Sequence, residues 1–184
     1  MSTSTPSFDY DPSLQEYAVH EKEFLRQHPR YSVLCTGIVV FHENGKLLLV
    51  QRAADEKAFP NAWEVPGGKV DDTDESILHA AVRELKEETG LKATRILRKV
   101  GESEFSDRGR HGPEQWWLKT IFEMEVQSMD ALVLDPIEHQ AHLFASEEDV
   151  VNNCVGDLKM VYMPQPSKEI KLEAFRLRQE ALPK

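Results

Sequence analysis

The chain has 184 residues and a formal net charge of -10 at pH 7, because 32 acidic residues outnumber 22 basic ones. This length suits one domain of ordinary size with its own hydrophobic core. The acidic balance argues against binding to a nucleic-acid polymer, which requires a basic surface. Small phosphorylated ligands stay open, since bound metal ions can invert the local charge.

Two cysteines, Cys35 and Cys154, lie far apart, which fits neither a disulfide framework nor a CxxC metal site. Cys35 lies in an apolar run and is expected to be a buried, inert thiol. The first residues lack the basic and apolar regions of a signal peptide, and no apolar stretch approaches the length of a membrane span. We therefore expect a cytoplasmic protein with no membrane partner.

The N-terminal part of the chain is predicted to be a polar segment over 1–12 and a short helix over 13–28 that packs on the main domain. A buried strand is predicted over 33–41, because this run is rich in β-branched residues. Asn44-Gly45 separates it from the apolar run 47–52, and Asn-Gly between two apolar runs predicts a β-hairpin. The chain then forms a loop over 53–62, followed by a short extended piece over 63–65 and the turn Pro66-Gly67-Gly68.

A helix is predicted over 73–89. Asp72 with Glu75 three residues later forms a capping pair, and Thr73 is an alternative cap. Gly90 follows the last turn as a left-handed stop. The later elements are strands at about 93–104, 115–126 and 141–145, a short helix starting at 146–149 and a charged helix over 167–181.

The predicted helix carries an acidic cluster. On a helical wheel, Glu84, Glu87 and Glu88 share one arc beside the apolar stripe, flanked only by Arg83. Like charges at i,i+4 cost roughly 0.2–0.5 kcal/mol even when exposed, so such a cluster needs a compensating cation. Hard oxygen ligands suit Mg²⁺ or Mn²⁺. A bare run of Glu would indicate a solvated face, but the glycine turn that feeds this helix makes the combination specific.

The glycine turn and the acidic helix together resemble the Nudix box. In that pattern a Gly, five residues, a Glu and seven residues precede Arg-Glu-apolar-any-Glu-Glu-any-Gly-apolar. The segment from Arg83 to Leu91 matches throughout, and Glu75 has the family spacing to Arg83. Six residues, not five, separate Gly68 from Glu75, so this loop carries a one-residue insertion that leaves its shape open.

The resemblance implies a MutT-like Nudix hydrolase, and the wider order of strands fits that fold over about 32–155. The expected architecture is α/β, a Nudix-type α/β/α sandwich with a mixed sheet. Its single domain spans 32–184 and includes a C-terminal helix, with the tail and short helix of 1–31 packed on it. The oligomeric state is not predicted.

The resemblance also implies which residues bind metal and which position them. The implied metal ligands are the carbonyl of Gly67 and the carboxylates of Glu84, Glu87 and Glu88. Arg83 is expected to orient the acidic residues by pairing with Glu87 or Glu75. The metal ions bridge carboxylates and phosphate oxygens, so that an anionic substrate can approach an anionic site.

The general base has two candidates. Glu84 resembles the residue that acts as base in some members and as metal ligand in others. Other members take the base from a later loop, here 135–140, which makes Glu138 the rival, with Glu123 a weaker candidate. For Glu138 and Glu123 an ordinary surface carboxylate is an equally good interpretation.

The candidate substrate-binding residues are Arg52, Lys69 and Trp117. Trp117 adjoins Trp116 in a predicted strand, so the two face opposite sides, and one can stack on a base while the other fills the core. Two weaker hypotheses concern other residues. A phosphate-holding loop would use Arg108, Arg110 and His111, and a zinc pair would use His139 and His142, for which the sequence supplies no further ligand motif.

The expected reaction is cleavage of a nucleoside diphosphate linked to another moiety, including oxidised nucleoside triphosphates. The segments 49–52 and 63–68 resemble the nucleotide-cleansing branch of the family. Alternative substrates are dinucleoside polyphosphates and diphosphoinositol polyphosphates, of which the latter favour a strongly basic pocket. A further alternative is a non-catalytic Nudix-fold binding module. Such modules usually lose box glutamates, and this chain keeps them all.

Overall fold

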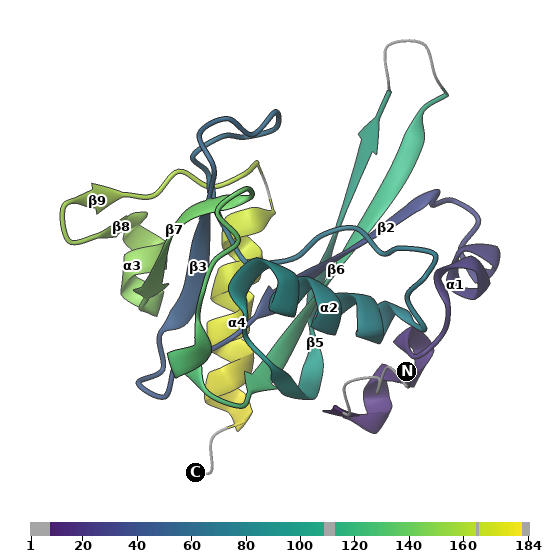
Figure 1. Ribbon diagram of the computed structural model, residues 1–184, viewed down its shortest axis with the longest axis horizontal. Helices are drawn as coiled ribbons and strands as arrows, with labels where there is room; N and C mark the ends of the chain where they lie inside the picture. Colours follow the sequence, from purple (N-terminus) through teal and green to yellow (C-terminus); the bar gives the residue numbers. More distant parts are fainter. Residues whose placement is uncertain (1–7, 109–112, 165, 182–184) are drawn as a thin grey trace.

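A computed structural model describes residues 8–108, 113–164 and 166–181 (Figure 1). Two sheets form its frame. The larger is mixed and has the order β1-β5-β6-β2, with β5 and β6 antiparallel and with β1 and β2 parallel to their neighbours. Its strands are β1 (Asp9–Tyr10), β5 (Ala93–Asp107), β6 (Gln115–Val126) and β2 (Val33–Val39).

The second sheet is antiparallel, with the order β4-β3-β7. Its strands are β4 (Trp63–Glu64), β3 (Leu47–Arg52) and β7 (His139–Ala145). The shorter elements are η1 (Pro12–Tyr17), α1 (Glu21–Gln27), η2 (Met129–Ala131), α3 (Glu147–Asn152), β8 (Cys154–Val155) and β9 (Leu158–Lys159).

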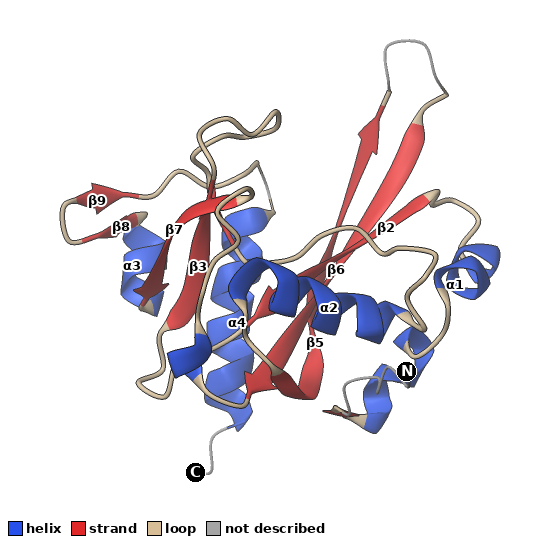
Figure 2. Cartoon of the chain, viewed as in Figure 1, coloured by secondary structure: helices blue, strands red, loops and turns tan. Residues whose placement is uncertain are grey.

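Two long helices, α2 (Ile77–Thr89) and α4 (Ser167–Ala181), cover opposite faces of the larger sheet (Figure 2). A hydrophobic core lies on each face of this sheet, and one strand contributes to both, because its successive side chains point to opposite faces. Phe122 packs in the cluster beneath α2, and Ile121 packs in the cluster beneath α4. This arrangement is the predicted α/β/α sandwich with a mixed sheet.

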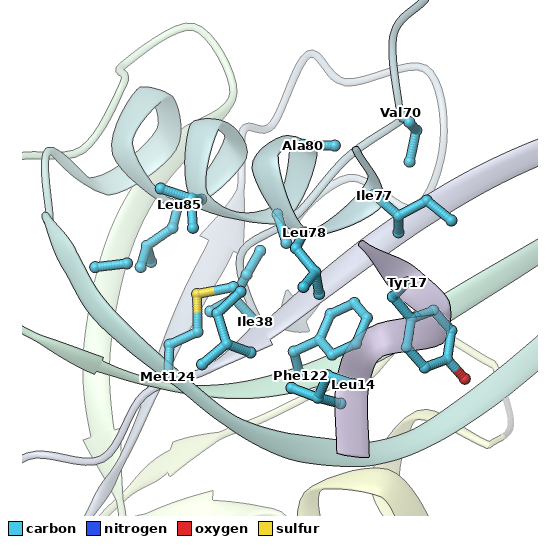
Figure 3. Packing of buried hydrophobic residues seen from close by; sticks show 14 of the residues in the cluster. Leu14, Tyr17, Ile38, Val70, Ile77, Leu78, Ala80, Leu85, Phe122 and Met124 are labelled. Carbon is cyan, nitrogen blue, oxygen red and sulfur yellow. The ribbon is translucent and has the colours of Figure 1, made fainter. Parts of the chain in front are cut away.

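The core beneath α2 also takes in the N-terminal segment. Figure 3 shows Leu14 and Tyr17 of η1 packed beside Leu78 of α2 and Phe122 of β6. The predicted helix over 13–28 is in fact two short helices, because Asp11 caps η1 and His20 caps α1, each accepting from a backbone N–H. Both still pack on the domain through buried side chains.

The predicted hairpin is half right. Its turn forms: Gly45 has φ 80° and its N–H donates to the carbonyl of His42 at 2.8 Å. The two strands then diverge, with β2 pairing β6 and β3 pairing β4 and β7. Only a bridge between Phe41 and Leu47 remains of the predicted ladder. Both runs are buried, and each pairs with a distant strand.

Helix α2 begins at Ile77 and not at 73. Its N-cap is Ser76, whose hydroxyl accepts from His79 N at 3.3 Å, so the capping pair predicted at Asp72 and Glu75 is wrong. Gly90 ends the helix in the left-handed conformation, as predicted. The strand over 115–126 and the helix over 167–181 have their predicted bounds.

Both cysteines have free thiols, and burial raises the pKa of Cys35 to about 11. None of the helices that the structure describes is long and apolar enough to cross a lipid bilayer.

Candidate active site

The turn before α2 is held against β2 by alternate carbonyls. The carbonyls of Pro66 and Gly68 accept from Ile38 N and Thr36 N at 2.7 and 2.8 Å. Between them, the carbonyl of Gly67 accepts no hydrogen bond from the described residues, so it is free to bind a cation. Gly67 has φ 142°, and a Cβ there would lie 2.2 Å from the carbonyl oxygen of Thr36. Only glycine fits this position.

Glu88 is the most buried carboxylate of the acidic helix, with 3% of its surface exposed. Its Oε2 accepts from Gly67 N at 2.8 Å, which ties the helix to the turn. Burial raises the pKa of Glu88 to about 9, and the charges of Glu64, Glu138 and Glu84 add to that rise. A carboxylate in this environment keeps its negative charge at neutral pH only when a cation compensates it.

Glu84 lies one turn earlier, partly buried against Gly68. A Cβ on Gly68 would lie 2.6 Å from Glu84 Oε2, so the second glycine provides the room for this carboxylate. Burial raises the pKa of Glu84, with contributions from Glu87 and Glu138. The charges of Glu84 and Glu138 thus each raise the pKa of Glu88, and the charge of Glu138 raises that of Glu84 as well.

Arg83 clamps the outer part of the cluster. Its Nη1 lies 2.7 Å from Glu84 Oε1 and 2.9 Å from Glu87 Oε2, and the Glu87 side chain is 58% exposed. In these positions no three His, Cys, Asp or Glu side chains of the described chain are grouped to hold a metal ion. Glu84 and Glu87 face Arg83, whereas Glu88 faces Gly67, so the predicted ligands share one helix face but not one coordination centre.

The residues nevertheless fit a hard divalent cation by their chemistry. The helix supplies carboxylate oxygens on successive turns, the turn supplies a free carbonyl, and the buried Glu88 lacks a cationic partner among the described residues. Mg²⁺ and Mn²⁺ prefer such oxygen donors. Side-chain rotation of Glu84 and Glu87 away from Arg83 would complete the set.

Asp74, and not Glu75, is the anchor of Arg83. Arg83 Nε lies 2.9 Å from Asp74 Oδ1, and Nη2 lies 2.8 Å from Oδ2. The Glu75 side chain is 70% exposed and lies near His79. Five residues separate Gly68 from Asp74, so Asp74 has the family spacing from the glycine. The prediction of Glu75 used only its spacing to Arg83, so it did not identify Asp74 as the partner of Arg83.

Replacing Asp74 with Asn should therefore destabilise the protein, whereas Glu75→Gln should not. The Asn amide presents N–H groups to a guanidinium that has only donors, so Asp74→Asn should lower the free energy of unfolding by about 1–3 kcal/mol. Urea unfolding of both variants provides the measurement. Equal effects of the two neighbouring substitutions would contradict this assignment.

The two rival bases occupy different positions. Glu138 is exposed in the loop before β7, where its carbonyl accepts from Ala53 N at 2.8 Å. Its charge contributes to the raised pKa values of Glu84 and Glu88. Glu123 is buried and pairs instead with Arg98 and Arg178, on β5 and α4, which removes it from the candidate site.

Glu64 is a site residue that the sequence motif did not single out. It is 5% exposed, its Oε1 lies 2.8 Å from Arg52 Nη1, and it lies 3.6 Å from the buried ring of His139. Burial opposes ionisation, but His139, Lys119 and Arg52 together lower the pKa of Glu64 to about 2. Arg52 is thus engaged by Glu64, by Glu56 and by the carbonyl of Ala58.

A cavity of about 310 Å³ adjoins this carboxylate. Its walls come from β5, β6, the segment before α4 and the first turns of α4. Most of them are apolar, and the lining consists of Phe59, Glu64, Val65, Ser103, Glu104, Phe105, Ser106, Lys119, Ile121, Met163, Pro164, Pro166, Ser167, Ile170 and Lys171. The cavity therefore offers an apolar, concave site next to Glu64.

The other predicted substrate-binding residues lie around this cavity but do not line it. Trp117 stacks on the lining residue Phe105, with ring centroids 5.4 Å apart, so it supports the wall. Lys69 is exposed beside the glycine turn. Trp116 packs beneath Arg30, on the other side of β6.

The two weaker hypotheses gain no support from the described residues. Arg110 and His111 lie outside these residues, while Arg108 pairs with Glu114 at 3.9 Å. His139 and His142 join no metal-binding group within the described ranges.

Comparison with known proteins identifies the family that this sequence matches. The NUDIX domain model matches residues 32–156. The CTP pyrophosphohydrolase of Escherichia coli (strain K12) is 32% identical over 144 residues, covering 78% of this chain and 92% of that protein. The m7GpppN-mRNA hydrolase NUDT17 of Danio rerio is 56% identical over 55 residues, which cover 30% of this chain. The match spans only 18% of that relative's length.

Among solved structures, the MutT protein of Methanosarcina mazei Go1 has the same fold, with a TM-score of 0.62 at 22% identity. The match covers 83% of this chain and 98% of that one. Members of this family generally use divalent metal ions, in keeping with the carboxylate helix. The chain belongs to the Nudix family.

Proposed function

We propose that the chain is a Mg²⁺- or Mn²⁺-dependent pyrophosphohydrolase that cleaves a nucleoside diphosphate linked to another moiety, nucleoside triphosphates and their oxidised forms included. The observation that carries this proposal is the position of Glu64. It lines the apolar cavity, and three residues later Gly67 N donates to Oε2 of the buried Glu88 at 2.8 Å. A nucleoside seated in the cavity therefore directs its phosphates toward the proposed metal ligands.

The proposed ligands are the Gly67 carbonyl and the carboxylates of Glu84, Glu87 and Glu88. A bound divalent cation supplies Lewis acidity at phosphorus and lowers the pKa of an attacking water. Arg83 positions Glu84 and Glu87 through its two short contacts. A carboxylate that is not committed to the metal, Glu138 or Glu84, takes the proton of the water.

The remaining candidates act from the margin of the site. Lys69 is exposed beside the glycine turn and available to a phosphate oxygen, Arg52 fixes Glu64, and Trp117 supports the cavity wall. Since α4 lines the cavity, we propose that residues 32–184 act as one functional unit, with 1–31 packed on it.

The apolar cavity favours a nucleoside over a diphosphoinositol polyphosphate, whose many phosphates need a strongly basic surface. The resemblance to the bacterial CTP pyrophosphohydrolase favours nucleoside triphosphates among the nucleotide substrates. The proposal is tested by a hydrolysis panel with product identification. The panel contains nucleoside triphosphates, oxidised nucleotides, dinucleoside polyphosphates, capped RNA and a diphosphoinositol polyphosphate. Release of nucleoside monophosphate is the expected result, and inactivity toward every nucleotide would overturn it.

Metal removal gives a separate prediction. In excess EDTA turnover should vanish, because the clustered carboxylates then lack the cation that lets an anionic substrate bind. The fold should persist, because both cores are built without the site. Activity assays and thermal unfolding with and without EDTA provide the measurement. Full turnover in EDTA, or a large loss of melting temperature, would contradict the prediction.

A further inference from the structure

The apolar cavity contains four charged side chains, and only two of them are paired. Glu64 pairs with Arg52 at 2.8 Å, and Glu104 pairs with Arg30 at 2.8 Å. Both carboxylates are thus neutralised by arginines that do not line the cavity. Lys119 and Lys171 make no ion pair with any residue of the described part of the chain. The cavity therefore holds two unpaired amines among apolar walls.

Lys171 lies on α4 with only 2% of its surface exposed. Its Nζ donates to the carbonyl of Ser167 at 3.1 Å and to the hydroxyl of Ser167 at 2.7 Å. The same amine lies 4.6 Å from the centroid of the Tyr162 ring. An ammonium group has three donors, so the two hydrogen bonds leave one for a ligand. Burial, reinforced by the charge of Lys119, lowers the pKa of Lys171 to about 7. Burying an amine is costly, and an apolar side chain of similar length would fill this position at lower cost.

Lys119 reaches the same cavity from β6. Its stem passes over Gly37 of β2, where an added Cβ would lie 3.0 Å from Lys119 Cε. Its amine makes no hydrogen bond with the described residues, and its charge lowers the pKa values of both Glu64 and Lys171. The backbone of β2 thus fixes the stem, while the head remains available within the cavity.

We propose that Lys119 and Lys171 select substrates whose ring presents carbonyl oxygens to the cavity, that is, oxo-substituted heterocycles such as uracil or guanine. Two donors in an apolar enclosure are complementary to acceptors. Adenine carries a donating amino group where the oxo rings carry an accepting oxygen, so it leaves one of the two amines without a partner. A site built from buried hydrogen-bonding groups rejects an analogue that lacks the matching group. This inference rests on the proposed function, because it names the ring that accompanies the phosphates.

The test compares kcat/KM for UTP and ATP in the wild type and in Lys171→Met, which keeps the length of the side chain and removes the donor. The wild type should prefer UTP, and the variant should lose about 10-fold or more of that preference, mainly through a higher KM for UTP. Lys171→Arg retains donors and should keep most of the preference. Lys168→Met is the matched control on the same helix, because Lys168 contacts Val151 and does not line the cavity.

A binding assay separates this inference from the proposed function. Calorimetry with uridine and adenosine in EDTA needs no metal and no phosphate, and the wild type should bind uridine more tightly. If that preference disappears in Lys171→Met while no nucleotide is hydrolysed, the inference stands and the proposed function fails. If nucleotides are hydrolysed but the variant keeps both the kcat/KM ratio and the uridine preference, the inference is overturned. A wild type without any preference for oxo rings overturns it too. Lys119→Met provides a second variant should Lys171→Met fail to fold.

Discussion

Glu88→Gln should abolish turnover and at the same time stabilise the metal-free protein. Glutamine keeps the size of the side chain but removes the charge that compensates a metal ion beside Gly67. Metal ions contribute several kcal/mol of transition-state stabilisation, so losing a ligand should lower kcat/KM by about 10³-fold. Raised Mg²⁺ should restore part of the rate, since the remaining ligands still bind the ion weakly.

The gain in stability follows from the raised pKa of Glu88. Burial raises this pKa to about 9 in the folded, metal-free protein, from the ordinary 4.5 of a glutamate. Unfolding between these two values releases a proton, so the wild type loses stability as the pH rises from about 4.5 to 9. Glu88→Gln has no charge to bury. Its melting temperature in EDTA should exceed that of the wild type at pH 8, and the difference should shrink toward pH 5.

Thermal unfolding over that pH range and single-substrate kinetics test both parts, with Glu75→Gln as the exposed control. Should Glu88→Gln retain wild-type turnover on every active substrate, the metal assignment on α2 would be wrong. A metal-free variant that melts below the wild type at pH 8 would show that the carboxylate stabilises the fold instead.

The second large effect separates the general base from the metal ligands. Glu138→Gln should lower kcat by about 10²–10⁴-fold, the loss typical of a missing base, and added Mg²⁺ should not rescue it. Glu84→Gln should also lose activity but should regain part of it as Mg²⁺ is raised. The structure favours this division because Arg83 and Gly68 hold Glu84 on the ligand arc, whereas Glu138 is exposed and makes no ion pair with the described residues.

Rates are measured for both variants from low to saturating Mg²⁺, and pH profiles of kcat accompany them. If added Mg²⁺ rescues Glu138→Gln but not Glu84→Gln, the base is Glu84 and not Glu138. A Glu138→Gln variant with wild-type kcat would reduce Glu138 to a surface carboxylate.

Local sequence rules predicted the parts of the site that depend on helical phase. Glu84, Glu87 and Glu88 lie on one face of α2 because their spacing alone sets that phase. The start of α2 was missed, because Ser76 competes with Asp72 and Thr73 as a cap, and the turn closed by Asp74 on Asp71 N decides between them. The same closure presents Asp74 to Arg83 in place of Glu75.

The cavity was beyond sequence reasoning for a different reason. Lys171 and Lys119 are 52 positions apart, and they come together only because Phe175 and Ala174 of α4 pack on the face of the sheet that carries Ile121. The charged pattern of α4 predicted a helix but not the direction in which Lys171 points. Glu64 was likewise visible only as a neighbour of the glycine turn until β4 placed it beside Arg52 and His139.

Gly37 of β2 lies between two parts of the site, the glycine turn and Lys119. A Cβ added to Gly67 would lie 2.7 Å from the Cα of Gly37. A Cβ added to Gly37 would lie 3.0 Å from Lys119 Cε, so the glycine makes room for that lysine. A single residue of β2 therefore separates the carbonyl proposed to bind metal from an amine proposed to bind the ring. A residue larger than glycine at position 37 would therefore crowd Lys119 on the strand that also holds the glycine turn.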